Sequence, residues 1–322
     1  MKEFLTHIPV APEGLPVTDI YAESAQFPGV AVDGGALRVH WQSFTSCHAI
    51  LRTGILGADG LTGVENISGD GEVLYPVSLA CDGGVWYAWG EAANDRWSIK
   101  ARFVKAGTWS DTLVVDEDEA LFYPSLFLQH GKPCLLWTRQ HRGTAQAVLC
   151  PLSQNGCGTQ EIVSQSKEAF RANACEGGDG NLYLTYDVYE NGGYDVIARV
   201  KTASGWSAEV RADQTEDWVC APRIVATPTG ATVCWYTFGY GATFAVYSAD
   251  LAVSEGALCA APALTLTENV GWYMDLTAAS NKAGLQIVAY TWSKNSVQIR
   301  YRRGAGAWSL PAQMSYGDGH CA

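Results

Sequence analysis

The chain has 322 residues, of which 48% are hydrophobic and 17% are charged. Its 33 acidic residues outnumber its 21 Lys and Arg residues, which leaves a formal net charge of −12. This composition excludes a disordered chain and a coiled coil, and the negative charge makes duplex nucleic acid and anionic membranes poor partners. No run of about 18 apolar residues is present, so we expect no membrane-spanning helix.

The first 26 residues stand outside the repeat pattern described below. Their opening, MKEFLTHIPVAPEG, lacks the apolar core that a signal peptide needs, so we expect a cytoplasmic protein, or a secreted one if an export signal has been removed. The run VTDIYAE at 17–23 is typical of a strand, and we expect it to pair with the last repeat and close a ring.

Aromatic residues recur at a nearly constant interval along the rest of the chain. Steps of 48, 48, 49 and 49 residues separate the first five of the set Trp41, Trp89, Trp137, Tyr186, Trp235 and Tyr290. An upstream apolar run in the first five copies begins at Pro28, Pro76, Pro124, Ala172 and Pro222. Recurrence at the repeat period predicts that the aromatic side chains pack between neighbouring sheets, and we interpret the Trp-Ser pairs at 109–110, 206–207 and 308–309 in the same way.

Each copy contains four short alternating runs separated by Gly or Asp-Gly turns, the pattern of antiparallel strands joined by hairpins. A four-stranded unit repeated every 40 to 50 residues or so is typical of a β-propeller. We therefore predict an all-β fold, a six-bladed β-propeller of four-stranded antiparallel blades, with seven blades as the alternative. The predicted blades span residues 27–71, 72–118, 119–167, 168–215, 216–267 and 268–315, after a closing segment at 1–26.

The ten cysteines show no Cys-x-x-Cys pair and no spacing typical of a zinc site. Several lie inside apolar runs, where a free Cys packs as a small hydrophobic residue. We expect free thiols, with a bridge between Cys150 and Cys157 across a short turn as the alternative.

The blade pattern resembles that of the sialidase-like, BNR-type propellers, as the segments at 123–137 and 175–207 show. The resemblance covers most of the chain and implies a propeller fold and a saccharide ligand. No copy contains the Ser-x-Asp-x-Gly-x-x-Trp box of that family. That family binds a substrate carboxylate with three arginines. Only one of them has a counterpart in this chain, Arg171, and Ala172-Asn173 replace the Ile-Pro expected after it. The resemblance therefore implies no catalytic residue.

The loops that follow each second strand gather at one mouth of a propeller, where unlike side chains can meet. The position two residues after the repeated aromatic residue differs from copy to copy, and is occupied by Ser43, Glu91, Arg139, Val188, Thr237 and Trp292. The following loops are rich in His, Trp, Tyr and charged residues, which is unusual for inert surface, although any single charged member also fits a solvated loop.

Two kinds of chemistry fit these residues. Glycoside hydrolysis needs two carboxylates, and elimination by a lyase needs a His or Tyr base beside an Arg that neutralises charge. The catalytic candidates are Glu91, His141, Asp187 and His48, with Asp95, Glu190 and Asp217 as further carboxylates. The candidates for substrate binding are Arg139, Arg171, Tyr189, Tyr194, Trp97, Trp218, Trp272 and Trp292.

A glutamate precedes the innermost strand in five copies, at Glu72, Glu119, Glu168, Glu216 and Glu268. Because this recurrence follows the repeat, we favour a structural role in which the carboxylates cap backbone amides. The alternative is an acidic rim that binds a structural cation at the channel mouth. We predict no catalytic metal and no cofactor.

Three functions remain. The unlike residues after the aromatic positions favour a carbohydrate-active enzyme, a glycoside hydrolase or a lyase with one site at the channel mouth. The alternatives are a lectin-like protein with one sugar site and a protein-interaction scaffold. The expected ligand is a small molecule or an oligosaccharide. No serine-hydrolase elbow, zinc-protease helix or phosphate-binding glycine loop occurs in the sequence.

Overall fold

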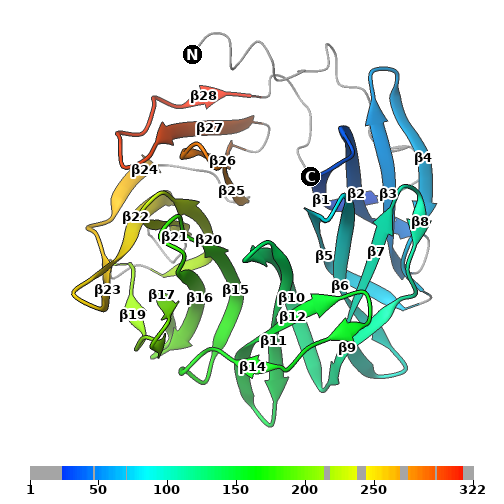
Figure 1. Ribbon diagram of the computed structural model, residues 1–322, viewed down its shortest axis with the longest axis horizontal. Helices are drawn as coiled ribbons and strands as arrows, with labels where there is room; N and C mark the ends of the chain where they lie inside the picture. The colour runs from blue at the N-terminus through cyan, green and yellow to red at the C-terminus, as the bar shows by residue number, and fades with distance from the viewer. Residues whose placement is uncertain are drawn as a thin grey trace.

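The computed structural model describes residues 24–45, 48–69, 71–213, 218–237, 244–268, 275–293 and 296–314. Within these ranges every regular element is a β-strand. The strands form six antiparallel sheets arranged as a six-bladed β-propeller (Figure 1). The predicted fold and blade number are confirmed. No helix that could cross a membrane occurs in the part of the chain described here.

The first three blades follow the chain without a crossover. The first contains β1 (Ser24–Asp33), β2 (Ala36–Thr45), β3 (His48–Gly57) and β4 (Gly60–Asn66). The second contains β5 (Glu72–Cys81), β6 (Gly84–Ala93), β7 (Arg96–Lys105), β8 (Thr108–Trp109) and β9 (Leu113–Asp118). The third contains β10 (Ala120–Gln129), β11 (Lys132–His141), β12 (Thr144–Ser153), β13 (Gly156–Cys157) and β14 (Glu161–Ile162).

The last three blades repeat the same order. The fourth contains β15 (Ala169–Glu176), β16 (Leu182–Glu190), β17 (Gly193–Thr202), β18 (Gly205–Trp206) and β19 (Val210–Arg211). The fifth contains β20 (Val219–Thr227), β21 (Gly230–Thr237), β22 (Ala245–Ser254), β23 (Ala257–Ala260) and β24 (Leu264–Glu268). The sixth contains β25 (Leu276–Ser280), β26 (Leu285–Ser293), β27 (Ser296–Arg303) and β28 (Ala312–Gln313).

The first strand of each blade lies at the centre of the ring. Contacts between successive blades join β1 to β5, β5 to β10, β10 to β15, β15 to β20 and β20 to β25. In four blades the outermost position is divided between two short strands that both pair with the third strand. The run at 17–23, predicted to close the ring, lies outside the described residues, and Glu268 ends the outer strand of the fifth blade rather than beginning the sixth.

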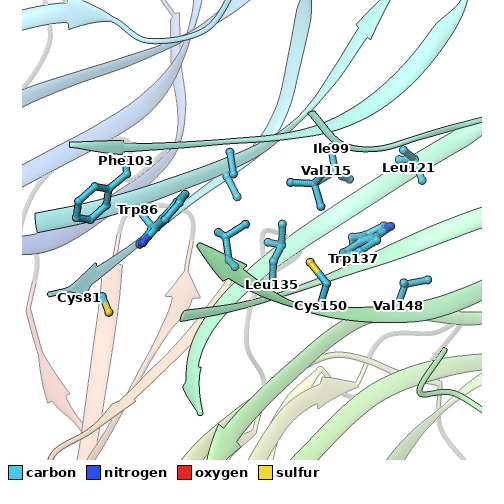
Figure 2. Close-up of a cluster of buried hydrophobic side chains, with 13 residues drawn as sticks. Cys81, Trp86, Ile99, Phe103, Val115, Leu121, Leu135, Trp137, Val148 and Cys150 are labelled. Atoms are coloured by element: carbon cyan, nitrogen blue, oxygen red, sulfur yellow. The ribbon is translucent and has the colours of Figure 1, made fainter. Parts of the chain in front are cut away.

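Among the described residues the hydrophobic core forms five layers, one between each two blades that follow one another along the chain. Figure 2 shows the layer between the second and third blades, in which Trp86 of β6 and Trp137 of β11 are both buried. The aromatic residue at the repeat period is at most 3% exposed in every blade, at Trp41, Trp89, Trp137, Tyr186, Trp235 and Tyr290. The interpretation of these residues as packing is confirmed.

A buried arginine holds the Trp-Ser pair of the fourth blade. Arg199 lies over the Trp206 ring, with its guanidinium carbon 5.3 Å from the ring centroid, and donates from Nε to the Ser207 carbonyl at 2.9 Å. It also donates to the carbonyl of Val163, which belongs to the third blade. The same donation to a serine carbonyl recurs with Arg102 and Ser110, and with Arg300 and Ser309. The Trp-Ser pairs therefore help to join one blade to the next.

One expectation about the cysteines was wrong. Cys150 and Cys157 form a disulfide, with their Cα atoms 6.2 Å apart, because β13 folds back along the end of β12 and brings the two residues within bonding reach. The other cysteines among the described residues are free, namely Cys81, Cys134, Cys175, Cys220, Cys234 and Cys259.

The innermost strand of the first five blades carries the same bulge. Two residues of this strand lie opposite one residue of the second strand there, so the pairing shifts by one residue in each of these blades. The first residue of each bulge has φ between 49° and 52°, at Phe27, Tyr75, Tyr123, Arg171 and Ala221. A left-handed backbone costs a residue with a side chain about 1 to 3 kcal/mol, and a bulge turns its side chain away from the direction that strand alternation dictates.

His40 links the first two blades just beneath this bulge. Its ring is 3% exposed, and Nε2 lies 3.3 Å from the Pro76 carbonyl oxygen. The ring fits because residue 29 is glycine, where a Cβ would lie 2.1 Å from His40 Cε1. Burial lowers the pKa of His40 to about 4, so the ring is neutral at neutral pH.

We expect Arg199→Ala to lower the free energy of unfolding by about 2 kcal/mol, because two buried carbonyls lose a charged donor. Urea denaturation measures the change. Arg303→Ala, which removes an exposed arginine of the sixth blade, serves as the control and should change stability by less than about 0.5 kcal/mol. Equal losses in the two variants would contradict a role for the arginine in joining blades.

The buried His40 makes stability depend on pH. Between the ordinary pKa of 6.5 and about 4, the unfolded chain binds a proton that the folded chain does not, so stability falls as pH decreases through this window. This contribution amounts to about 3 kcal/mol at one pKa unit per 1.4 kcal/mol. We expect the stability of His40→Gln to depend less on pH over this range, as measured by denaturation at several pH values. Parallel pH curves for the two proteins would disprove the assignment.

Candidate functional site

The side chains at the bulge positions form a row across four blades. The Phe27 and Tyr75 ring centroids are 5.2 Å apart, and those of Tyr75 and Tyr123 are 4.5 Å apart. The Arg171 guanidinium carbon lies 5.4 Å from the Tyr123 ring centroid. We call these four residues the bulge row. Their common position on four innermost strands places them at the mouth of the channel where the second strands end.

An ion pair holds the charged member of the bulge row in place. Arg171 donates from Nε to Asp187 Oδ2 at 2.8 Å, and Nη2 makes a second bond to the same oxygen. Asp187 is fully buried on β16, where its Oδ1 has no hydrogen-bond partner among the described residues. Burial raises the pKa of Asp187, the Arg171 charge opposes that shift, and the carboxylate in turn raises the pKa of Arg171. Arg171 is therefore a fixed positive charge whose side chain keeps 22% of its surface exposed.

Aromatic rings also flank Arg171 on the side of the fourth blade. Its guanidinium carbon lies 5.3 Å from the Tyr194 ring centroid, and Tyr194 contacts Tyr189 with centroids 4.9 Å apart. Both tyrosines belong to the hairpin of β16 and β17. Trp218 packs against the backbone of this hairpin, where a Cβ at Gly193 would lie 3.1 Å from the indole.

Burial raises the pKa of two tyrosines near Arg171, Tyr75 and Tyr236. The pKa of Tyr75 rises to about 12; the neighbouring Tyr123 adds to the rise and the Arg171 charge opposes it. On the fifth blade, burial raises the pKa of Tyr236 above the ordinary tyrosine range, and that of its hydrogen-bonded neighbour Cys220 to about 11. Tyr236 also lies within the field of Arg171.

This arrangement combines three chemical features. A guanidinium binds a carboxylate through two parallel hydrogen bonds. Tyrosine hydroxyls donate and accept protons, and aromatic faces pack against the apolar face of a ring. The site is therefore suited to a ring-shaped ligand that carries a carboxylate and needs a proton moved.

Five residues selected from the sequence lie in this region. Arg171 and Asp187 form its ion pair, and Tyr194, Tyr189 and Trp218 extend it outward. Four of them come from the fourth blade.

Glu91 lies elsewhere, in the layer between two blades. It is 2% exposed and accepts hydrogen bonds from Trp89 Nε1 at 2.9 Å and Lys100 Nζ at 2.5 Å. The physical reason is strand alternation, because a residue two positions after the aromatic one shares its face and points into the same packed layer. Its catalytic role stays a prediction without support from this position.

The remaining candidates also lie apart from the bulge row. Arg139 donates from Nε to Asp116 Oδ2 at 2.8 Å, and His141 Nδ1 lies 2.9 Å from Asp118 Oδ1, both across to β9 of the second blade. Trp97 packs edge-on against Phe122 with centroids 5.1 Å apart. His48 is exposed at the start of β3. Trp272 and the side chain of Trp292 lie outside the described residues.

Sequence analysis missed Tyr75, Tyr123 and Tyr236. The Tyr-Pro pair at 75–76 recurs at 123–124, but we used it only to align the repeats. Asp187 and Tyr236 stand one residue after the repeated aromatic position, on the opposite face of the strand. Asp187 was already a candidate, and a search at that offset would also have found Tyr236.

Two of the glutamates before the inner strands cap backbone amides. Glu72 Oε2 accepts a hydrogen bond from the Ala49 amide at 3.0 Å, and Glu119 Oε2 accepts one from the Arg142 amide at 3.0 Å. This agrees with the structural role favoured by the repeat. Glu216 lies outside the described residues. Within the described ranges, no three His, Cys, Asp or Glu side chains are arranged to hold a metal ion.

No protein-family model matches this chain, and no curated protein matches it. Among solved structures, two of an ulvan lyase of polysaccharide lyase family PL25 align with TM-scores of 0.61 and 0.60, over 90% of this chain and 80% of theirs, at 8% identity. An endo-arabinase from Bacteroides thetaiotaomicron aligns with a TM-score of 0.49, over 72% of this chain and 95% of its own, at 11% identity. The likeness to the ulvan lyase supports the propeller fold, whereas membership of the sialidase-like superfamily is not shown.

We expect Asp187→Asn to lower the free energy of unfolding by about 2 kcal/mol, which is less than for a fully buried pair because Arg171 keeps contact with water. The double variant Arg171→Gln, Asp187→Asn leaves no unpaired charge and should be more stable than Asp187→Asn alone. Chemical denaturation of the unchanged protein, Arg171→Gln, Asp187→Asn and the double variant measures this coupling. Additive losses would show that the two side chains do not depend on each other.

Proposed function

We propose that this protein is a carbohydrate-active enzyme that cleaves a saccharide containing a carboxylated sugar by β-elimination, that is, a lyase. The observation that carries the proposal is a fixed Arg171 guanidinium in contact with Tyr123, whose ring packs against that of Tyr75 with the two centroids 4.5 Å apart. One such unit supplies both the charge and the proton-transfer groups that elimination requires.

The comparisons agree with this class. The ulvan lyase, a polysaccharide lyase, is described as bound to -[GlcA(1-4)Rha3S]-, which contains a carboxylated sugar. The resemblance to sialidase-like propellers points the same way, because that family binds a substrate carboxylate through arginine and Arg171 is the position that matches. We include that kinship, and an oligosaccharide ligand, in the proposal.

The proposed reaction uses each group once. Arg171 binds the sugar carboxylate and stabilises the negative charge that develops when the neighbouring carbon loses its proton. Tyr123, in its deprotonated form, is the base that takes that proton. Tyr75 donates a proton to the glycosidic oxygen as its bond to the ring breaks. A carbon–carbon double bond forms in the ring, and transfer of a proton from Tyr123 to Tyr75 restores their starting state.

Hydrolysis is the second candidate, favoured by one observation. Asp187 is a buried carboxyl group whose pKa burial raises, and whose Oδ1 has no hydrogen-bond partner among the described residues, as a general acid requires. A glycosidase also needs a second carboxylate about 5 to 10 Å away. Among the described residues, Asp187 is the carboxylate that contacts the bulge row, and it is engaged by Arg171.

The test is turnover of polysaccharides that contain glucuronic, galacturonic or mannuronic acid, with neutral arabinan alongside. We expect an ultraviolet-absorbing unsaturated sugar at the new chain end, identified by mass spectrometry, from at least one acidic polymer. We expect Tyr75→Phe and Tyr123→Phe each to lower kcat by about a hundredfold or more, because each removes a proton-transfer group. Tyr301→Phe in the sixth blade is the control and should leave kcat unchanged.

Each other outcome has a definite meaning. Saturated products would favour hydrolysis by a carboxylate, and loss of activity in Asp187→Asn but not in Tyr123→Phe would support it. Binding without any product would indicate a sugar-binding protein. Full activity in both tyrosine variants would disprove the proposed mechanism.

A further inference from the structure

Aromatic rings extend from Arg171 in two directions. One direction runs through Tyr123 and Tyr75 to Phe27 on the first blade. The other runs through Tyr194 to Tyr189, beside the indole of Trp218. We call these six aromatic residues and Arg171 the aromatic track.

The ends of the track are its most exposed aromatic residues. Phe27 is 42% exposed, Tyr189 is 42% exposed and Trp218 is 43% exposed. Single exposed apolar residues are common, but exposed rings at both ends of a continuous series of contacts form a patch, and such patches mark binding surfaces.

Both ends are also held in place by the backbone. Phe27 occupies a left-handed conformation with φ of 49°, which strand geometry alone would not choose for a phenylalanine. Trp218 lies close against Gly193, where a Cβ would approach the indole to 3.1 Å. The rings are thus positioned before any ligand arrives, which lowers the entropy cost of binding.

We propose that the aromatic track binds a saccharide chain that continues past Arg171 on both sides, so that the protein acts on internal units of a polymer. The cleavage position rests on the proposed function, whereas binding along the track does not. Arg171 takes the carboxylate of the unit at the centre, and the rings on either side pack against the apolar faces of the flanking sugars. Because both directions from Arg171 offer rings, units before and after the central one gain binding energy.

The first experiment measures the affinity of uronic acid oligosaccharides of increasing length by calorimetry. We expect affinity to rise with length until both ends of the track are covered. Phe27→Ala and Trp218→Ala should each lower the affinity of long oligosaccharides by about tenfold and leave that of the shortest ligand unchanged, since one stacked ring contributes about 1 kcal/mol. Phe27→Tyr and Trp218→Phe, which keep a ring, should retain most of the affinity. Leu310→Ala, at an exposed apolar residue on the sixth blade, is the control for surface truncation.

The second experiment follows the products released from an acidic polymer over time. Cleavage at internal units predicts an early fall in viscosity and oligosaccharides of intermediate length. Release of single sugars from chain ends would overturn the inference while leaving the proposed reaction intact.

The two experiments separate the two proposals. Affinity that rises with length and falls in both alanine variants, without any cleavage product, would support the track and disprove the enzyme. Affinity independent of length, or unchanged in Phe27→Ala and Trp218→Ala, would disprove the track even if product forms. No binding and no turnover with any acidic saccharide would disprove both.

Discussion

A four-stranded blade has two apolar faces, and in this chain it buries them against the blades on either side. The repeated aromatic residue meets this constraint by packing against the preceding blade, as Trp137 does in the layer of Figure 2. Buried arginines of the Trp-Ser pairs and His40 add hydrogen bonds across the same boundaries. Each blade therefore depends on its neighbours for its stability, and the ring positions the first strands side by side around the channel.

The same arrangement explains where chemistry can occur. Residues that face a neighbouring blade are committed to packing, and Glu91 and Arg139 show that even charged side chains there are paired within the layer. The bulge in the innermost strand releases one residue per blade from this role and turns it toward the channel mouth. Five blades share that backbone, yet its first residue is Phe, Tyr, Tyr, Arg or Ala. The same bulge thus presents side chains of different chemistry at the channel mouth.

Arg171 shows how the bulge and the packing cooperate. Its charge is neutralised from below by a fully buried carboxylate on the neighbouring strand, while rings from two blades cover its sides. An arginine fixed in this way presents its remaining surface to a ligand with little loss of side-chain entropy. Burial raises the pKa of Tyr75, whose ring contacts that of Tyr123, so a protonated hydroxyl lies nearby. Charge, proton source and apolar surface therefore meet at one point although they come from separate blades.

The sequence by itself determined the all-β class, the number of blades and the role of the repeated aromatic residues, because all three follow from periodicity that any alignment of the chain with itself displays. It also selected Arg171, Asp187, Tyr189, Tyr194 and Trp218 as candidates, and the structure brings these five residues together. Only the tertiary structure revealed the bulge, because Tyr and Arg are not residue types that indicate a positive φ, and so nothing in the sequence predicts one at Tyr75 or Arg171. Side chains alternate between the two faces of a strand. Glu91, two positions after the repeated aromatic residue, therefore lies in a packed layer, whereas Asp187, one position after it, lies behind the channel. Only the tertiary structure shows which way each face points.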